Sequence, residues 1–167
     1  IIAITGVDTR ALTARIREKG MPNGVIAHDP KASFDIAKLK AEAKAWPGLD
    51  GMDLVPDVTS GQSYTWDEMR WVWGKGYARQ EHPQLHVVAI DYGLKRNILR
   101  CLATAGCKVT VLPATATAED VLARKPDGIF LSNGPGDPAA TGKYAVPEIK
   151  KLVATGKPLF GICLGHQ

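Results

Sequence analysis

The sequence predicts an α/β protein whose second half forms a doubly wound, mainly parallel sheet, preceded by part of a smaller α+β domain. Three observations lead to this fold class. After residue 84, apolar runs alternate with segments of helical period, the loops between them are short, and glycine or proline ends most segments. Strands that alternate with helices in this way pair in parallel through right-handed crossovers, with helices on both faces of the sheet.

Four strands and three helices are expected in residues 85–167. The predicted strands are short apolar runs rich in valine, isoleucine and leucine, as is typical of strands buried on both faces. They cover residues 85–90, 109–112, 128–131 and 159–162, and the predicted helices cover residues 95–105, 117–124 and 144–155. In such sheets ligands bind at the carboxyl ends of the strands, so candidate site residues are sought in the loops that follow them.

In residues 1–48, the sequence pattern predicts one strand and two helices. Residues 1–4 have the composition of a strand. Asp8 is placed as the N-cap of a helix that Gly20 ends, and Ser33 as the N-cap of a second helix that stops at Pro47-Gly48.

In residues 49–84, the sequence pattern predicts a loop followed by an antiparallel ribbon. Residues 49–60 are rich in Asp, Gly and Pro, whereas residues 64–77 interleave tryptophans with polar residues at a spacing of two. Aromatic residues at strand spacing favour a core or subunit contact over stacking on a ligand. Residues 80–84 are interpreted as a linker, which divides the chain into residues 1–84 and 85–167.

Composition and charge exclude several classes of function. No apolar run approaches the ~20 residues of a membrane span. The net charge of +4 is small, and the basic residues are scattered without the aromatic residues of a single-strand binder. Cys101, Cys107 and Cys163 are odd in number and lack metal-ligand spacing. We therefore expect a cytoplasmic protein with no metal site, no membrane contact and no nucleic-acid partner.

The last ten residues carry the strongest candidate for chemistry. Gly161-x-Cys163-x-Gly165 follows an apolar strand and has the form of a nucleophile elbow, a sharp turn that exposes its central side chain. A helix beginning at Leu164 would direct free N–H groups at the thiol, favouring the thiolate and a developing oxyanion. The alternative is a buried cysteine that closes a core strand, because free cysteine often packs as a small hydrophobe.

A second candidate element follows the predicted strand at residues 128–131. Residues 132–138, here called the arch, read Ser-Asn-Gly-Pro-Gly-Asp-Pro, which predicts a rigid irregular backbone. The arch lacks the spacing of a phosphate-binding loop. One N–H group from the arch and one from the elbow would instead form an oxyanion-binding pair. A plain turn is the alternative.

The two motifs together resemble the class I glutamine amidotransferases. The resemblance lies in Asn133-Gly134-Pro135-Gly136-Asp137-Pro138 followed by Gly161-Ile162-Cys163-Leu164-Gly165-His166-Gln167. It implies a class I glutaminase domain, here truncated, in which Cys163 is the catalytic nucleophile. It also implies that Gly134, Gly136, Leu164 and Gln167 bind glutamine, and that the N–H groups of Gly136 and Leu164 hold the oxyanion.

Segments elsewhere narrow the resemblance to the small-chain family of the carbamoyl-phosphate synthetases. These segments are residues 6–13, 17–20, 47–54 and 91–100. The resemblance implies hydrolysis of L-glutamine and passage of ammonia to a large subunit, which uses ATP, magnesium and bicarbonate to make carbamoyl phosphate for arginine and pyrimidine biosynthesis. It implies no cofactor in this chain, and it assigns residues 1–84 to the small chain's N-terminal domain.

The sequence departs from this family in extent. It begins at Ile1 without methionine and ends at Gln167, and we interpret it as an interior fragment. The family's base histidine and orienting glutamate lie downstream of the elbow, so His166 is given no catalytic role. Residues 1–167 alone are expected to show little or no glutaminase activity.

Two other functions stay open. One is the glutaminase subunit of another synthase, such as that of anthranilate or GMP synthesis, although the segments in residues 1–84 favour the carbamoyl-phosphate family. The other is a non-catalytic, glutaminase-like binding module, against which the thiol in an intact elbow argues.

Overall fold

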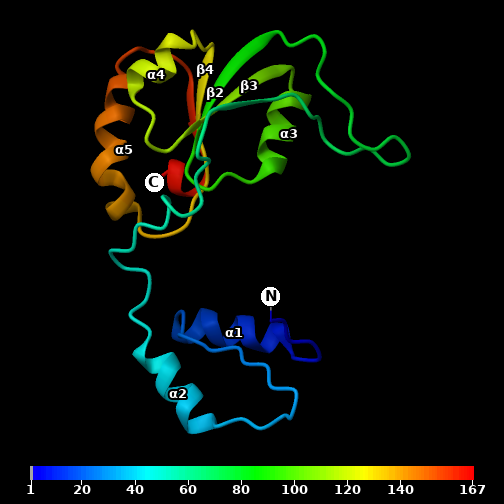
Figure 1. The fold of residues 1–167 in the computed structure, drawn as a ribbon, viewed down its shortest axis with the longest axis vertical. Coiled ribbons are helices and arrows are strands. Elements are labelled where there is room, and N and C mark those ends of the chain that lie inside the picture. Colours follow the sequence, from blue (N-terminus) through cyan, green and yellow to red (C-terminus); the bar gives the residue numbers. More distant parts are fainter. Residues whose placement is uncertain (1) are drawn as a thin grey trace. The chain divides into compact units, whose positions relative to one another are not determined.

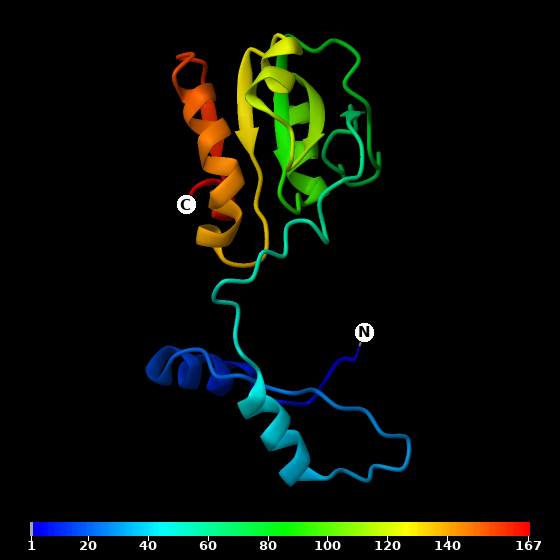
Figure 2. The same ribbon diagram turned by 60° about the vertical axis from the view of Figure 1, so that its left-hand side comes forward.

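The structure, a computed structural model, describes residues 2–167 (Figure 1). The chain divides into two compact units, Ile1–Gly48 and Leu49–Gln167. The second unit holds a five-stranded sheet in the order β1-β3-β2-β4-β5. Figure 2 shows α5 (Pro138–Val153) lying alongside this sheet.

Four of the five strands run in parallel. β2 pairs with both β3 and β4, and β4 pairs with β5, while β1 lies antiparallel to β3 at one edge. The doubly wound, mainly parallel sheet predicted from the sequence is confirmed. The switch point of such a sheet, where connections leave toward opposite faces, lies here between β2 and β4. The strands are β1 (Tyr64–Trp66), β2 (Leu85–Asp91), β3 (Cys107–Pro113), β4 (Gly128–Leu131) and β5 (Leu159–Gly161).

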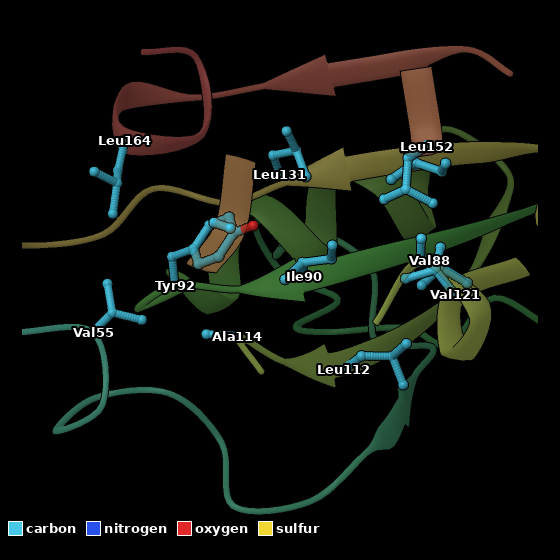
Figure 3. Packing of buried hydrophobic residues seen from close by; sticks show 13 residues of the cluster. Val55, Val88, Ile90, Tyr92, Leu112, Ala114, Val121, Leu131, Leu152 and Leu164 are labelled. Atoms are coloured by element: carbon cyan, nitrogen blue, oxygen red, sulfur yellow. The ribbon is translucent and has the colours of Figure 1, made fainter. Parts of the chain in front are cut away.

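Helices cover both faces of the sheet. α3 (Arg96–Thr104) packs on one face, and α4 (Ala118–Ala123) and α5 pack on the other (Figure 1). Because successive strand residues point to opposite faces, the three central strands β3, β2 and β4 each contribute to two cores. In β4, Phe130 belongs to the core under α3, whereas Leu131 belongs to the core under α4 and α5 (Figure 3).

The largest difference between predicted and observed helices in the second unit is the start of α5. The sequence predicted a helix over residues 144–155, but α5 begins at Pro138. Proline suits the first position of a helix because its missing N–H is not needed there. Asp137 caps this end, accepting a hydrogen bond from the Ala139 N–H at 2.8 Å.

The first unit consists of two helices, α1 (Thr9–Lys19) and α2 (Ile36–Ala45). Asp8 is confirmed as the N-cap of α1, accepting a hydrogen bond from the Ala11 N–H at 2.9 Å. The predicted cap at Ser33 is wrong, because the Asp35 side chain accepts from the Lys38 N–H at 3.0 Å.

The strand predicted at residues 1–4 is also absent from the described part, residues 2–4, and Ile1 lies outside the description. A strand needs a neighbour to satisfy its backbone groups, and no strand is found among residues 2–48. The first unit, as described, is therefore helical, and its place in a smaller α+β domain stays a prediction.

The two compact units are divided between residues 48 and 49, whereas the domain boundary expected at residues 84 and 85 stays a prediction. Residues 49–84 belong with the sheet because β1 pairs with β3 and because the loop before it is tied to β2. The Thr59 hydroxyl donates to the Asp91 carbonyl at 2.6 Å, and the Ser60 N–H donates to the Asp91 carboxylate at 2.9 Å.

The predicted antiparallel ribbon over residues 64–77 is shorter than expected. Beyond β1, only isolated antiparallel bridges at Glu68–Arg79 and Val72–Gly76 are found in this stretch of the described chain. Trp66 packs against the core under α3. Trp71 and Trp73 are 50% and 86% exposed, so the prediction of a core contact is wrong for both. A subunit contact stays a prediction.

Residues 2–167 contain neither a membrane-spanning helix nor a cluster suited to a metal ion. None of the helices in this range has the length and apolar character needed to span a membrane. Nor does this range bring together three or more His, Cys, Asp or Glu side chains in a way that suits a metal ion.

Replacing Thr117 with alanine is expected to lower the free energy of unfolding by about 1 kcal/mol. Thr117 is the N-cap of α4 and forms a capping box with Asp120. The Thr117 hydroxyl accepts a hydrogen bond from the Asp120 N–H at 3.1 Å, and the Asp120 carboxylate accepts one from the Thr117 N–H at 2.9 Å. Chemical denaturation measures the loss. Thr115→Ala, the same change at an exposed position, is the control, and an equal loss there would contradict the capping role.

Candidate active site

The elbow, residues 161–165, presents the Cys163 side chain at the surface. β5 ends at Gly161, Ile162 is extended, and Cys163 has a φ of 53°. A residue other than glycine in this left-handed region is unusual and marks a local backbone constraint. Cys163 is exposed. The alternative interpretation, a cysteine buried in the core, is therefore wrong for this structure.

The helix predicted to begin at Leu164 stays a prediction, because only residues 164–167 of it lie in the described chain. A single 3-10 turn covers Cys163–Gly165, and the His166 and Gln167 N–H groups donate to the Cys163 carbonyl at 2.9 and 3.1 Å.

Both flanking glycines of the elbow are required by close backbone contacts. A Cβ atom on Gly161 would lie 2.5 Å from the Gly165 carbonyl carbon and 2.9 Å from the His166 nitrogen. A Cβ atom on Gly165 would lie 2.6 Å from the Leu131 carbonyl carbon. These distances are shorter than any side chain tolerates, so the turn folds tightly over itself and over the end of β4.

The arch is fixed at its start by the loop that follows β2. The Tyr92 N–H donates to the Ser132 hydroxyl at 2.8 Å, and the Asn133 amide donates to the Gly93 carbonyl at 2.9 Å. Asn133 also accepts from the Lys95 N–H at 3.2 Å. The arch therefore stands at the switch point between β2 and β4, where the topology places ligands.

Direct contacts join the arch and the elbow. The Gly165 N–H donates to the Ser132 carbonyl at 3.1 Å, and a Cβ atom on Gly134 would lie 2.6 Å from Cδ2 of Leu164. Leu164 is 8% exposed and belongs to the same core cluster as Tyr92 and Val55 (Figure 3). Its side chain thus anchors the turn under the arch while Cys163, one residue earlier, stays exposed.

Several backbone N–H groups at this site are without an acceptor within the described residues, those of Gly136 and Leu164 among them. Among residues 2–167, neither the Gly136 N–H nor the Leu164 N–H donates a hydrogen bond to another group of the protein. Gly136 has a φ of 89°, a conformation that glycine adopts without strain. These are the two groups that the sequence predicted for the oxyanion.

A separate hollow of about 680 Å³ lies between α5 and the residues after Cys163. Leu164, His166 and Gln167 line it, but Cys163, Gly134 and Gly136 do not. Of the predicted glutamine-binding residues, the structure brings Gly134 and Leu164 into contact. Gln167 is exposed and lies on the side of the hollow. The hollow is mainly apolar and is not the space beside the thiol.

Sequence reasoning missed the segment that supports the far end of the arch. Gly51 and Met52 both hydrogen-bond to Asp137, although the sequence predicted a plain loop over residues 49–60. On the side of Gly51 and Met52 these hydrogen bonds use backbone groups, which every residue type has. The identity of the residues at positions 51 and 52 therefore does not indicate the contact. The Asp137-Pro138 pair, an N-cap followed by a helix-starting proline, was the available signal for the start of α5.

The second unit is similar in sequence to a known protein family. The sequence profile of the family described as "Glutamine amidotransferase class-I" matches residues 88–167, which include the arch and the elbow. Residues 88–167 of this chain are therefore similar to the class-I glutamine amidotransferases.

The chain as a whole is homologous to proteins named "Carbamoyl phosphate synthase small chain". It is 68% identical to the protein of Bradyrhizobium diazoefficiens and 64% identical to that of Caulobacter vibrioides, each over 167 residues and 100% of this chain. It is 67% identical to that of Ruegeria pomeroyi over 99% of this chain. The chain spans 42%, 43% and 43% of those three proteins, respectively.

Proposed function

We propose that the protein containing this chain is the glutamine-hydrolysing small chain of a carbamoyl-phosphate synthetase, a ligase. It would release ammonia from L-glutamine and deliver it to a large subunit, which makes carbamoyl phosphate from bicarbonate and ATP. The observation that carries the proposal is an exposed Cys163 on a strained turn, in direct contact with an arch that has a free N–H group. The match to small chains, 68% identical over the whole chain and so including residues 1–84, favours this synthase over those of anthranilate or GMP synthesis.

The geometry supports a covalent route for the hydrolysis. The Cys163 sulfur attacks the side-chain carbonyl carbon of glutamine, and the carbonyl oxygen becomes an oxyanion that the Gly136 and Leu164 N–H groups hold. The C–N bond then breaks, ammonia leaves, and a glutamyl thioester remains on Cys163. Water hydrolyses this thioester to glutamate and the free thiol.

The remaining roles follow the same proposal. Gly134, Gly136, Leu164 and Gln167 bind glutamine, and the base comes from a histidine downstream of residue 167, paired with a glutamate. Residues 1–48, with the segment up to residue 84, correspond to the later part of the small chain's N-terminal domain, which contacts the large subunit. The protein acts in the cytoplasm and binds no nucleic acid.

The test uses the full-length protein together with its large subunit. Incubation with glutamine should release ammonia, and mass spectrometry of the acid-quenched protein should find the glutamyl adduct on the peptide that contains Cys163. An adduct on any other residue would overturn the assignment of the nucleophile. The absence of both ammonia and adduct would overturn the proposed function.

A further inference from the structure

The far end of the arch is held by a reciprocal pair of hydrogen bonds from a distant part of the chain. The Asp137 carboxylate accepts the Gly51 N–H at 2.7 Å through Oδ2, and the Asp137 N–H donates to the Met52 carbonyl at 2.8 Å. Gly51 and Asp137 are 86 positions apart in the sequence. Hydrogen bonds in which one partner is ionised are stronger than neutral ones, so the carboxylate is well suited to fix this contact.

The same segment forms the surface on which Gly136 rests. A Cβ atom on Gly136 would lie 2.6 Å from the Met52 carbonyl oxygen and 3.0 Å from the Leu54 nitrogen. The peptide that carries the free Gly136 N–H group is therefore pressed against the backbone of residues 52–54. Any movement of that backbone changes where the Gly136 N–H points.

We propose that Asp137 is a positioning residue of the glutaminase site, which holds the Gly136 N–H toward the oxyanion by clamping the arch to residues 51–54. This inference rests on the proposed function. A preorganised donor stabilises developing charge without having to reorient during the reaction, so its alignment matters most in the transition state. The clamp belongs to the arch alone and does not touch the thiol.

Asp137 also caps α5, and the two tasks are divided between its two oxygens. Oδ1 accepts the Ala139 N–H at 2.8 Å, whereas Oδ2 accepts the Gly51 N–H. These hydrogen bonds, that from Gly51 first and that from Ala139 second, hold the pKa of the Asp137 carboxyl below its ordinary value. The side chain is therefore ionised, with an acceptor facing each N–H group.

Asp137→Asn separates the two tasks. Asparagine is as good an N-cap as aspartate, so its amide oxygen keeps the bond to Ala139. Its NH₂ group then faces the Gly51 N–H, donor against donor, and the clamp opens. Thr117→Ala is the matched control, because it removes a helix cap in the same unit at a site far from the arch in the sequence.

The experiment measures glutamine hydrolysis by the full-length protein with its large subunit, for the wild type and both variants. Complete loss of an oxyanion donor costs on the order of 10²–10³ in rate, and a displaced donor loses part of that. We expect Asp137→Asn to lower kcat about tenfold, with KM changed by no more than about twofold. The rate at which iodoacetamide alkylates Cys163 should stay unchanged, because that reaction does not use the oxyanion donors.

The outcomes are distinct. Wild-type kcat in Asp137→Asn would overturn the positioning role, as would an equal loss of kcat in Thr117→Ala, which would show a general loss of structure. Slower alkylation in Asp137→Asn would place its effect on the thiol and would also overturn the role. A wild-type protein without glutamine turnover would instead refute the proposed function, a result that does not depend on either variant.

Discussion

Cys163→Ala is expected to abolish glutamine-dependent synthesis of carbamoyl phosphate by the full-length protein and its large subunit, while synthesis from added ammonia continues. Without the sulfur there is no nucleophile to attack the amide, and removal of a catalytic nucleophile typically costs on the order of 10⁴-fold or more in turnover. Ammonia supplied in solution bypasses that step. The measurement is carbamoyl phosphate formed with glutamine and with ammonium as alternative nitrogen sources.

Cys101→Ala is the matched control for this prediction. Cys101 is also an exposed, free cysteine, but it lies on α3 and away from the arch in the sequence. We expect both nitrogen sources to support wild-type rates in that variant. Equal glutamine-dependent rates in the wild type and Cys163→Ala would favour the binding module, a glutaminase-like domain that serves only to contact a partner.

The parallel sheet could be predicted because its signal is local. β2, β3 and β4 are buried on both faces, so each reads as a short apolar run, and glycine or proline marks many of the turns between them. β1 carries no such signal. Tyr64–Trp66 forms a strand because it pairs with the edge of β3. The partner residues are more than forty positions away in the chain, so the local sequence does not indicate the pairing.

Apolar periodicity alone does not produce burial, as the first unit shows. Ile36, Leu39 and Ala43 are spaced at i, i+3 and i+7 along α2, as on an apolar face, yet no residue of α2 is buried and Ile36 is 56% exposed. A stripe shows which face of a helix is suited to packing, but burial needs a second surface to receive it. Within a unit as short as Ile1–Gly48 there is little such surface.

The elbow and the start of the arch were predictable because steric demands leave a trace in the sequence. Only glycine fits where a Cβ atom would meet a carbonyl, so Gly161 and Gly165 indicate the close turn from the sequence alone. The contact between Asp137 and Gly51 leaves no comparable trace. The N-cap role, which is local, already accounts for an aspartate at position 137. The sequence therefore gives no reason to expect its second hydrogen bond, to the distant Gly51.

Gly165→Ala is expected to lower glutamine turnover by on the order of 10²-fold, because displacement of catalytic groups by about 1 Å costs this much. The new Cβ atom would lie 2.6 Å from the Leu131 carbonyl carbon and 2.7 Å from its Cβ. The atoms that resist it belong mostly to the backbone of β4, so a rotamer change cannot relieve the contact. The turn must move away from β4, and the 3.1 Å bond from the Gly165 N–H to the Ser132 carbonyl must lengthen.

The effect of Gly165→Ala is steric and not conformational, because Gly165 does not have a positive φ. Gly61→Ala is the appropriate control, since Gly61 also lacks a positive φ and a Cβ atom there meets nothing within 4 Å. We expect Gly61→Ala to retain wild-type turnover. In Gly165→Ala, Cys163 remains exposed and should still react with iodoacetamide, which separates a displaced turn from an unfolded protein. Turnover within twofold of the wild type would show that the arch and the elbow need not be in contact for hydrolysis, and the oxyanion pair would then have to be assigned to other groups.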